Sequence, residues 1–185
     1  EIGPGLGFLT RYLVNSGAQV IAIELDLDCV TLLSKLGAPN LKVIHADFLT
    51  IDVSLLGAGP LKIVGNIPYQ ITSPLLARIF GEIDAPNPSL KLIKEIVLTV
   101  QHEVALRLIA EPSTKDYSRI TLLSNYFANA RILRTVDAQS FFPVPQVNSA
   151  VVKFVPLPEP RVACEDRRLL RQLIQAGFRQ RRKMF

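Results

Sequence analysis

The feature that most constrains the fold is a regular alternation between two apolar patterns along the chain. Short runs rich in β-branched residues predict strands, and the stretches between them carry apolar residues at helical spacing. The expected strands are residues 19–23, 41–44, 92–100, 130–136 and 150–155, with a further run that begins at residue 63. The expected helices are residues 8–14, 29–36, 73–80, 104–109 and 120–127. This alternation predicts a mostly parallel sheet wrapped by helices.

The chain length predicts one α/β domain and the beginning of a second. The chain has 185 residues, 49% of them hydrophobic, which is enough for a full core. We expect the α/β domain over residues 1–156, and a linker with the first part of a helical domain over residues 157–185. Glu1 and Ile2 resemble the last residues of a strand, and the chain stops within an apparent helix. We therefore expect an internal fragment of a longer protein.

Residues 66–69 form a stiff turn after the run that begins at residue 63. Pro68 fixes its own backbone and holds Ile67 extended, so that the Ile67 carbonyl points out of the turn. The Asn66 side-chain oxygen and this carbonyl could accept both hydrogens of one exocyclic amine, while the Tyr69 ring could stack on a base. The alternative is a plain turn in which Asn66 caps and Tyr69 is half buried.

Three further features stand at the ends of the first expected strands. Gly3, Gly5 and Gly7 form a tight strand-to-helix turn that lacks the third glycine of a dinucleotide fingerprint, so it indicates either a small-ligand loop or a plain turn. Glu24 ends the next strand at the spacing of a ribose-binding carboxylate, although it could instead cap the following helix. Asp47 could accept from an adenine amino group while Phe48 covers the ring.

A second turn stiffened by proline, residues 141–149, carries two adjacent aromatic residues. Phe141 or Phe142 could form the wall of a base slot that faces Tyr69. Both rings could equally form a hydrophobic plug under a proline loop. The sequence leaves these two interpretations open.

The charge of the chain favours a polyanionic partner. The formal net charge is +5, and positive residues concentrate near the end of the chain, beside an apolar helical stripe. We expect these residues to contact phosphates of that partner: Arg168, Arg171, Arg179, Arg181, Arg182 and Lys183. Cys29 and Cys164 are far apart in the sequence, so neither a disulfide nor a metal site is indicated, and no apolar run reaches membrane-spanning length.

Several of these motifs occur together in one order, over essentially the whole chain. They are EIGPGLG at 1–7, IELD at 23–26, AD at 46–47, GNIPY at 65–69, FFPVPQVNSAVV at 141–152 and FRQRRK at 178–183. In this order they resemble the ribosomal RNA adenine N6,N6-dimethyltransferase family, specifically its small-subunit (16S-type) branch. The resemblance implies a Rossmann-like S-adenosylmethionine-dependent methyltransferase sheet with the start of a C-terminal helical domain, truncated at both ends.

The resemblance also implies roles for individual residues. S-adenosyl-L-methionine would be bound by Gly3, Gly5, Glu24, Asp47, the Phe48 backbone and Asn66. Catalysis would rest on Asn66, Ile67, Pro68 and Tyr69, with Phe141 as the second wall around a flipped adenine. The implied reaction is methyl transfer to N6 of two adjacent adenines near the 3′ end of small-subunit rRNA, within a pre-ribosomal particle.

The resemblance extends to the setting of the protein. We expect the protein to be a monomer that binds neither a metal nor a membrane. We expect it in a bacterial-type cytoplasm or an organelle. Because the segment that precedes the first strand in this family is absent, together with most of the helical domain, we expect the fragment to bind cofactor poorly and RNA weakly.

Three other functions compete with this one. The erythromycin-resistance methylases, which modify large-subunit rRNA, share nearly all of these motifs, but the ending at 178–183 and residues 117–119 favour the small-subunit branch. A largely non-catalytic ribosome-assembly factor is opposed by the intact residues 66–69. A small-molecule or protein methyltransferase is opposed by the basic C-terminal region.

Overall fold

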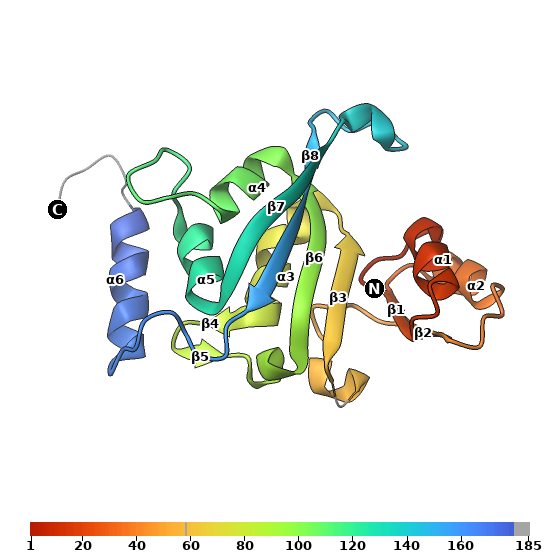
Figure 1. Cartoon of the computed structure of the whole chain (residues 1–185), viewed down its shortest axis with the longest axis horizontal. Coiled ribbons are helices and arrows are strands. Elements are labelled where there is room, and N and C mark those ends of the chain that lie inside the picture. Colours follow the sequence, from red (N-terminus) through yellow and green to blue (C-terminus); the bar gives the residue numbers. More distant parts are fainter. Residues whose placement is uncertain (58, 180–185) are drawn as a thin grey trace.

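A computed structural model of the chain describes residues 1–57 and 59–179, and Figure 1 shows the arrangement of their elements. The helices are α1 (Phe8–Asn15), α2 (Leu27–Ser34), α3 (Thr72–Phe80), α4 (His102–Leu108), α5 (Arg119–Phe127) and α6 (Arg167–Arg179). The strands are β1 (Val20–Glu24), β2 (Leu41–His45), β3 (Leu61–Asn66), β4 (Gly81–Glu82), β5 (Ala85–Pro86), β6 (Ile93–Gln101), β7 (Ala128–Val136) and β8 (Ser149–Pro156). Short 3-10 turns cover η1 (Val53–Leu56), η2 (Tyr69–Ile71), η3 (Pro88–Leu92) and η4 (Ala138–Ser140).

The main sheet is mostly parallel, as the alternation of patterns predicts. Strand β1 pairs with β2 and β3 pairs with β6, both in parallel. Ile2 joins these pairs because it bridges in parallel to Ile23 on one side and Gly65 on the other. Strand β8 lies antiparallel between β6 and β7. The order across the sheet is therefore β2, β1, residue 2, β3, β6, β8 and β7, with β8 alone reversed among these strands.

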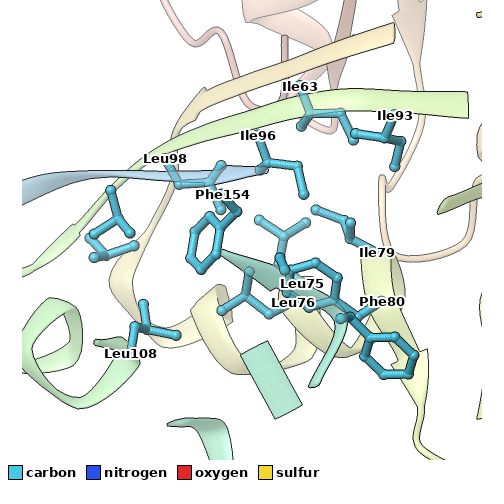
Figure 2. Close-up of a cluster of buried hydrophobic side chains, with 14 of the residues drawn as sticks. Ile63, Leu75, Leu76, Ile79, Phe80, Ile93, Ile96, Leu98, Leu108 and Phe154 are labelled. Atoms are coloured by element: carbon cyan, nitrogen blue, oxygen red, sulfur yellow. The ribbon is translucent and has the colours of Figure 1, made fainter. Parts of the chain in front are cut away.

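The core lies between this sheet and helices α3, α4 and α5. Alternate residues of β6 and β8 point to this face, and they include Ile96, Leu98 and Phe154, which are completely buried. Helix α3 covers them with side chains at helical spacing, as Figure 2 shows for Leu75, Leu76, Ile79 and Phe80. The Phe80 ring meets Phe154 edge-on at 5.9 Å and stacks on Phe127 at 6.0 Å.

The opposite face of the sheet is more polar. Glu95 alternates with the buried residues of β6, so it points away from α3. Its carboxylate pairs with Lys62 of β3 at 3.0 Å and with Lys153 of β8. Hydrogen bonds from Lys153 and Lys62 lower the pKa of Glu95 to about 2. The ion pairs therefore connect three adjacent strands on this face.

Two local features differ from the sequence predictions. Helix α3 begins at Thr72, one residue before the expected start at residue 73, and its N-cap is Ile71 without a side-chain cap hydrogen bond. The reason is that turn η2 runs directly into the helix, with the Thr72 hydroxyl donating to the Tyr69 carbonyl at 3.0 Å. The hairpin of β4 and β5 was not predicted, because its strands are only two residues long.

The residues after β8 pack against earlier parts of the chain. The Arg161 guanidinium donates to the Asn125 carbonyl at 2.8 Å and to Asn129 Oδ1 at 2.7 Å, which fixes the linker. Helix α6 packs Leu170 and Ile174 against the core. The expected boundary at 156/157 between two domains stays a prediction. Among the described residues, no helix has the length and apolar character that crossing a membrane requires.

Candidate active site at the carboxyl edge of the sheet

The predicted site residues gather at one edge of the sheet because the strands that carry them are parallel. Strands β1, β2 and β3 all end at this edge, where ligands bind in open α/β sheets. Residue 2 lies between β1 and β3, with the Ile2 amide donating to the Val64 carbonyl at 2.8 Å and the Gly3 amide donating to the Ile23 carbonyl at 2.9 Å. The glycine turn therefore emerges between Glu24 and Asn66.

The glycine turn has the backbone that only glycine adopts without strain. Gly3, Gly5 and Gly7 have φ values of 59°, 56° and 80°, in the left-handed region. A Cβ added at Gly3 or Gly5 would meet no atom within 4 Å, whereas one at Gly7 would lie 2.8 Å from Leu33 Cδ2. Gly7 is thus needed for packing against α2. Gly3 and Gly5 border open space, which fits a turn that a small ligand approaches closely.

Glu24 joins the glycine turn to the end of β1. One carboxylate oxygen accepts from the Gly5 amide at 2.8 Å, and the other accepts from the Leu25 and Asp26 amides at 2.8 and 2.9 Å. Glu24 does not cap α2, because Asp26 does so by accepting from the amides of residues 28 and 29. Since each carboxylate oxygen has about two acceptor positions, the oxygen that contacts Gly5 retains one that no other described residue is seen to occupy.

Asp47 lies in the turn after β2, beside Glu24. The Ala46 amide donates to the Glu24 carbonyl at 2.9 Å, and Asp47 Oδ1 accepts from the Leu49 amide at 2.9 Å. Phe48 is 5% exposed and belongs to the core, so the structure does not support the expectation that its ring covers an adenine. Only the Phe48 backbone remains as a contact for a ligand at this position.

The turn at residues 66–69 has exposed residues on either side of one buried residue. Asn66 ends β3 with an exposed side chain that forms no hydrogen bond to another described residue. The Ile67 side chain is buried in the core, so only its backbone can face a ligand. Pro68 is exposed, and Tyr69 is half buried with its hydroxyl 2.7 Å from Ser149 Oγ. Tyr69 is therefore held at the surface of the site and is not part of the interior.

The second aromatic turn is anchored at its base. Asp137 caps η4 by accepting from the Gln139 amide at 2.9 Å, and Asn148 Oδ1 accepts from the Ala138 amide at 3.0 Å. Phe141 is half buried, whereas Phe142 is fully exposed. The plug interpretation is therefore wrong for Phe142.

The basic residues separate into two groups. Arg168 and Arg179 are exposed on α6. Arg171 instead pairs with Asp84 at 3.2 Å and with Glu82 at 3.5 Å, so it attaches α6 to the hairpin of β4 and β5. This geometry does not support the prediction that Arg171 contacts RNA, because its charge is already compensated. Arg181, Arg182 and Lys183 lie outside the described residues.

Sequence reasoning assigned no role to Ser149, although it lies within a motif that the sequence singles out. Ser149 is completely buried at the start of β8 and contacts Tyr69, which is 80 residues away in the chain. A buried serine after a turn gives no signal of its own. The only available hint was its place at the end of the proline-containing block.

Comparisons with known proteins identify the family of the chain. A family model described as "Ribosomal RNA adenine dimethylase" matches residues 1–185. A protein of Acaryochloris marina called "Ribosomal RNA small subunit methyltransferase A" is 41% identical over all of this chain and 69% of its own length. The protein of the same name from Synechocystis is 43% identical over all of this chain and 66% of its own length. The chain therefore spans about two thirds of these relatives.

Solved structures show the same fold. A dimethyladenosine transferase from Plasmodium falciparum superposes with a TM-score of 0.76 at 29% identity, over 100% of this chain and 64% of the other. The 23S rRNA methyltransferase ErmE superposes with a TM-score of 0.74 at 30% identity, over 97% of this chain and 69% of the other. Both the family resemblance and the Rossmann-like fold are thereby confirmed. This chain belongs to the ribosomal RNA adenine dimethylases, a family of S-adenosylmethionine-dependent methyltransferases.

Proposed function

We propose that this chain supplies the catalytic part of an enzyme that dimethylates N6 of two adjacent adenines near the 3′ end of small-subunit rRNA. The observation that carries the proposal is the position of Asn66. It is exposed at the end of β3, between the glycine turn and a Tyr69 ring fixed by Ser149. The names of the curated relatives favour small-subunit rRNA as the substrate.

The cofactor would lie over the ends of β1 to β3. The Gly3 and Gly5 backbone leaves open space for it, the free acceptor position of Glu24 suits a ribose hydroxyl, and Asp47 suits an adenine amino group. The Phe48 backbone and the Asn66 side chain would complete its contacts. Bound S-adenosylmethionine supplies an electrophilic methyl group on a sulfonium.

The residues of the turn would prepare the adenine amine for attack. The lone pair of N6 is delocalised into the ring, which makes it a weak nucleophile. The Asn66 side-chain oxygen and the Ile67 carbonyl would accept its two hydrogens and favour a tetrahedral nitrogen with a localised lone pair. Such positioning and electrostatic stabilisation can supply catalysis without a strong base.

The aromatic residues would hold the adenine outside its RNA helix. Flipping a base costs a few kcal/mol of unstacking, and stacking on an aromatic side chain offsets about 1–3 kcal/mol per base. Tyr69 would form one wall of the slot and Phe141 the other.

Exposed Arg168 and Arg179 would contact phosphates, with Arg181, Arg182 and Lys183 as further candidates. We place this monomer on a pre-ribosomal particle, in a bacterial-type cytoplasm or an organelle.

The test measures transfer of a radiolabelled methyl group by the complete protein to small-subunit and large-subunit rRNA. We expect transfer to immature small subunits, and a loss of at least 100-fold in Asn66→Ala because one of the two acceptors for N6 is removed. Asn125→Ala is a control at an asparagine on α5, away from the site.

The outcomes discriminate among the functions. Transfer to large-subunit rRNA alone would establish the activity that ErmE, a 23S rRNA methyltransferase, is named for, which the structural similarity also permits. Full activity of Asn66→Ala would contradict the catalytic proposal. If Asn66→Ala cannot methylate but still supports ribosome assembly in cells, the protein acts mainly as a non-catalytic assembly factor.

A further inference from the structure

Tyr69 and Ser149 connect the two turns of the candidate site. The Tyr69 hydroxyl lies 2.7 Å from Ser149 Oγ. Tyr69 begins η2 directly after Pro68, and Ser149 begins β8 directly after the loop that carries Phe141. This contact is therefore a direct side-chain link between the turn at residues 66–69 and the second turn, at residues 141–149.

Ser149 occupies a rigid position in the sheet. Its backbone pairs with Gln101 of β6 and with Val136 of β7, so it lies between two strands. The preceding residue adds a further restraint, because the Asn148 carbonyl accepts from the His102 amide at 2.9 Å. A hydroxyl fixed in this way is a firm attachment point for a side chain at the surface of the site.

The Tyr69 ring needs such an attachment point if it is to stack on a base. A tyrosine side chain rotates about two torsions, and a half-buried ring that is held only at its backbone loses conformational freedom when it orders around a ligand. A hydrogen bond at the far end of the ring fixes both torsions before the ligand arrives. It also gives a physical reason for tyrosine, where phenylalanine would offer the same stacking surface.

We propose that Ser149 is a positioning residue for methyl transfer: it holds the Tyr69 ring in the orientation that stacks the target adenine. The inference rests on the proposed function, which supplies the identity of the base. The contact between Tyr69 and Ser149 does not depend on that function. Ser149 touches neither substrate nor cofactor in this scheme, and it acts only through Tyr69. Ser149, the last residue of the second turn, therefore orients a residue of the turn at 66–69.

The experiment is a double-mutant cycle in the complete protein with Tyr69→Phe, Ser149→Ala and the combined variant. Each single change removes the same hydrogen bond. We therefore expect each to lower kcat by about three- to tenfold, with cofactor affinity unchanged. The double variant should be no slower than the slower single variant, because the contact is lost only once.

The matched control is Ser124→Ala, a serine on α5 that is 1% exposed and donates to the Leu108 carbonyl at 3.2 Å. It should lower the melting temperature without changing kcat. If Ser149→Ala behaves like this control, with a lower melting temperature and kcat within twofold of wild type, the proposal is wrong. Multiplicative losses in the double variant would contradict it as well.

A second readout separates this inference from the proposed function. Protein labelled with 3-fluorotyrosine gives a ¹⁹F resonance for Tyr69, which the Tyr69→Phe spectrum assigns. Ser149→Ala should shift and narrow that resonance, because the ring gains motion, and Ser124→Ala should leave it unchanged. An unchanged resonance in Ser149→Ala would overturn the link even if methylation is observed. Conversely, a shifted resonance in a protein without methyltransferase activity would leave the link intact and refute the function.

Discussion

The two halves of the candidate site are built in different ways. The cofactor half joins the glycine turn to Glu24, 19 residues away, through backbone amides and one buried carboxylate. The adenine half joins residues 66–69 to the second turn through side chains 80 residues apart. The first half is thus fixed by short connections and backbone groups, and the second by the packing of distant strands. The difference predicts separate consequences for mutations in each half.

The largest loss of stability is expected at Glu24, whose side chain holds the glycine turn to the end of β1. Glu24→Ala removes the carboxylate partner of three part-buried amides, and a typical hydrogen bond contributes about 0.5–1.5 kcal/mol. We expect roughly 3 kcal/mol less stability in denaturant unfolding, and at least a tenfold loss of cofactor affinity by calorimetry. Glu24→Gln tests the link alone, because its oxygen still accepts from residues 25 and 26 while its amide faces the Gly5 amide. Wild-type affinity in both variants would contradict this account of the cofactor half.

The next largest loss of stability is expected at Gly7. It tests whether the glycine turn needs glycine for packing as well as for its backbone conformation. Gly7→Ala forces a left-handed alanine and places its Cβ 2.8 Å from Leu33 Cδ2. We expect a loss of about 2–3 kcal/mol in the free energy of unfolding. Gly17→Ala is the matched control, with φ of 81° but open space at the Cβ, and should cost only about 1 kcal/mol. Equal losses would show that packing against α2 contributes nothing.

The smallest effect is expected at the ion pairs on the polar face of the sheet, away from both halves. The folded-state pKa of Glu95 is depressed from 4.5 to about 2. The stability that it contributes is therefore complete above pH 4.5 and is lost as the pH falls toward 2. We expect Glu95→Gln to lower stability at pH 7 by about 1 kcal/mol, because Lys62 is 60% exposed and solvent screens the pair.

Melting curves of the wild type and Glu95→Gln from pH 7 to pH 2 check this prediction. The difference between them should stay constant down to about pH 4.5 and then shrink. Cofactor affinity should not change, since this cluster touches neither half of the site. A difference that is independent of pH throughout would show that the lowered pKa does not contribute to stability.

Local chemistry explains which residues of the candidate site the sequence could indicate. A left-handed backbone requires glycine, and an acid at the end of a parallel strand faces the ligand edge, so Gly3, Gly5 and Glu24 were identifiable from a short stretch. Their roles in binding cofactor stay predictions. Runs rich in β-branched residues likewise predicted strands β6 and β8 to within one residue at each end.

Side-chain partners were less predictable. Phe48 follows an expected ligand residue, but its ring packs in the core. Arg171 belongs to a basic helix, yet it pairs with two acids on a hairpin too short to predict. In both cases the deciding neighbour lies far away in the sequence, where no local pattern indicates it.

The sequence alone determined the family, the order of strands and helices, and the turns that present Asn66 and Tyr69. Those properties follow from local backbone preferences and from the spacing of apolar residues. Only the tertiary structure decided which carboxylate holds the glycine turn, which arginine is already paired and which hydroxyl fixes the Tyr69 ring. These contacts depend on how β1, β3 and β8 align within one sheet, and strand register is a property of the assembled sheet.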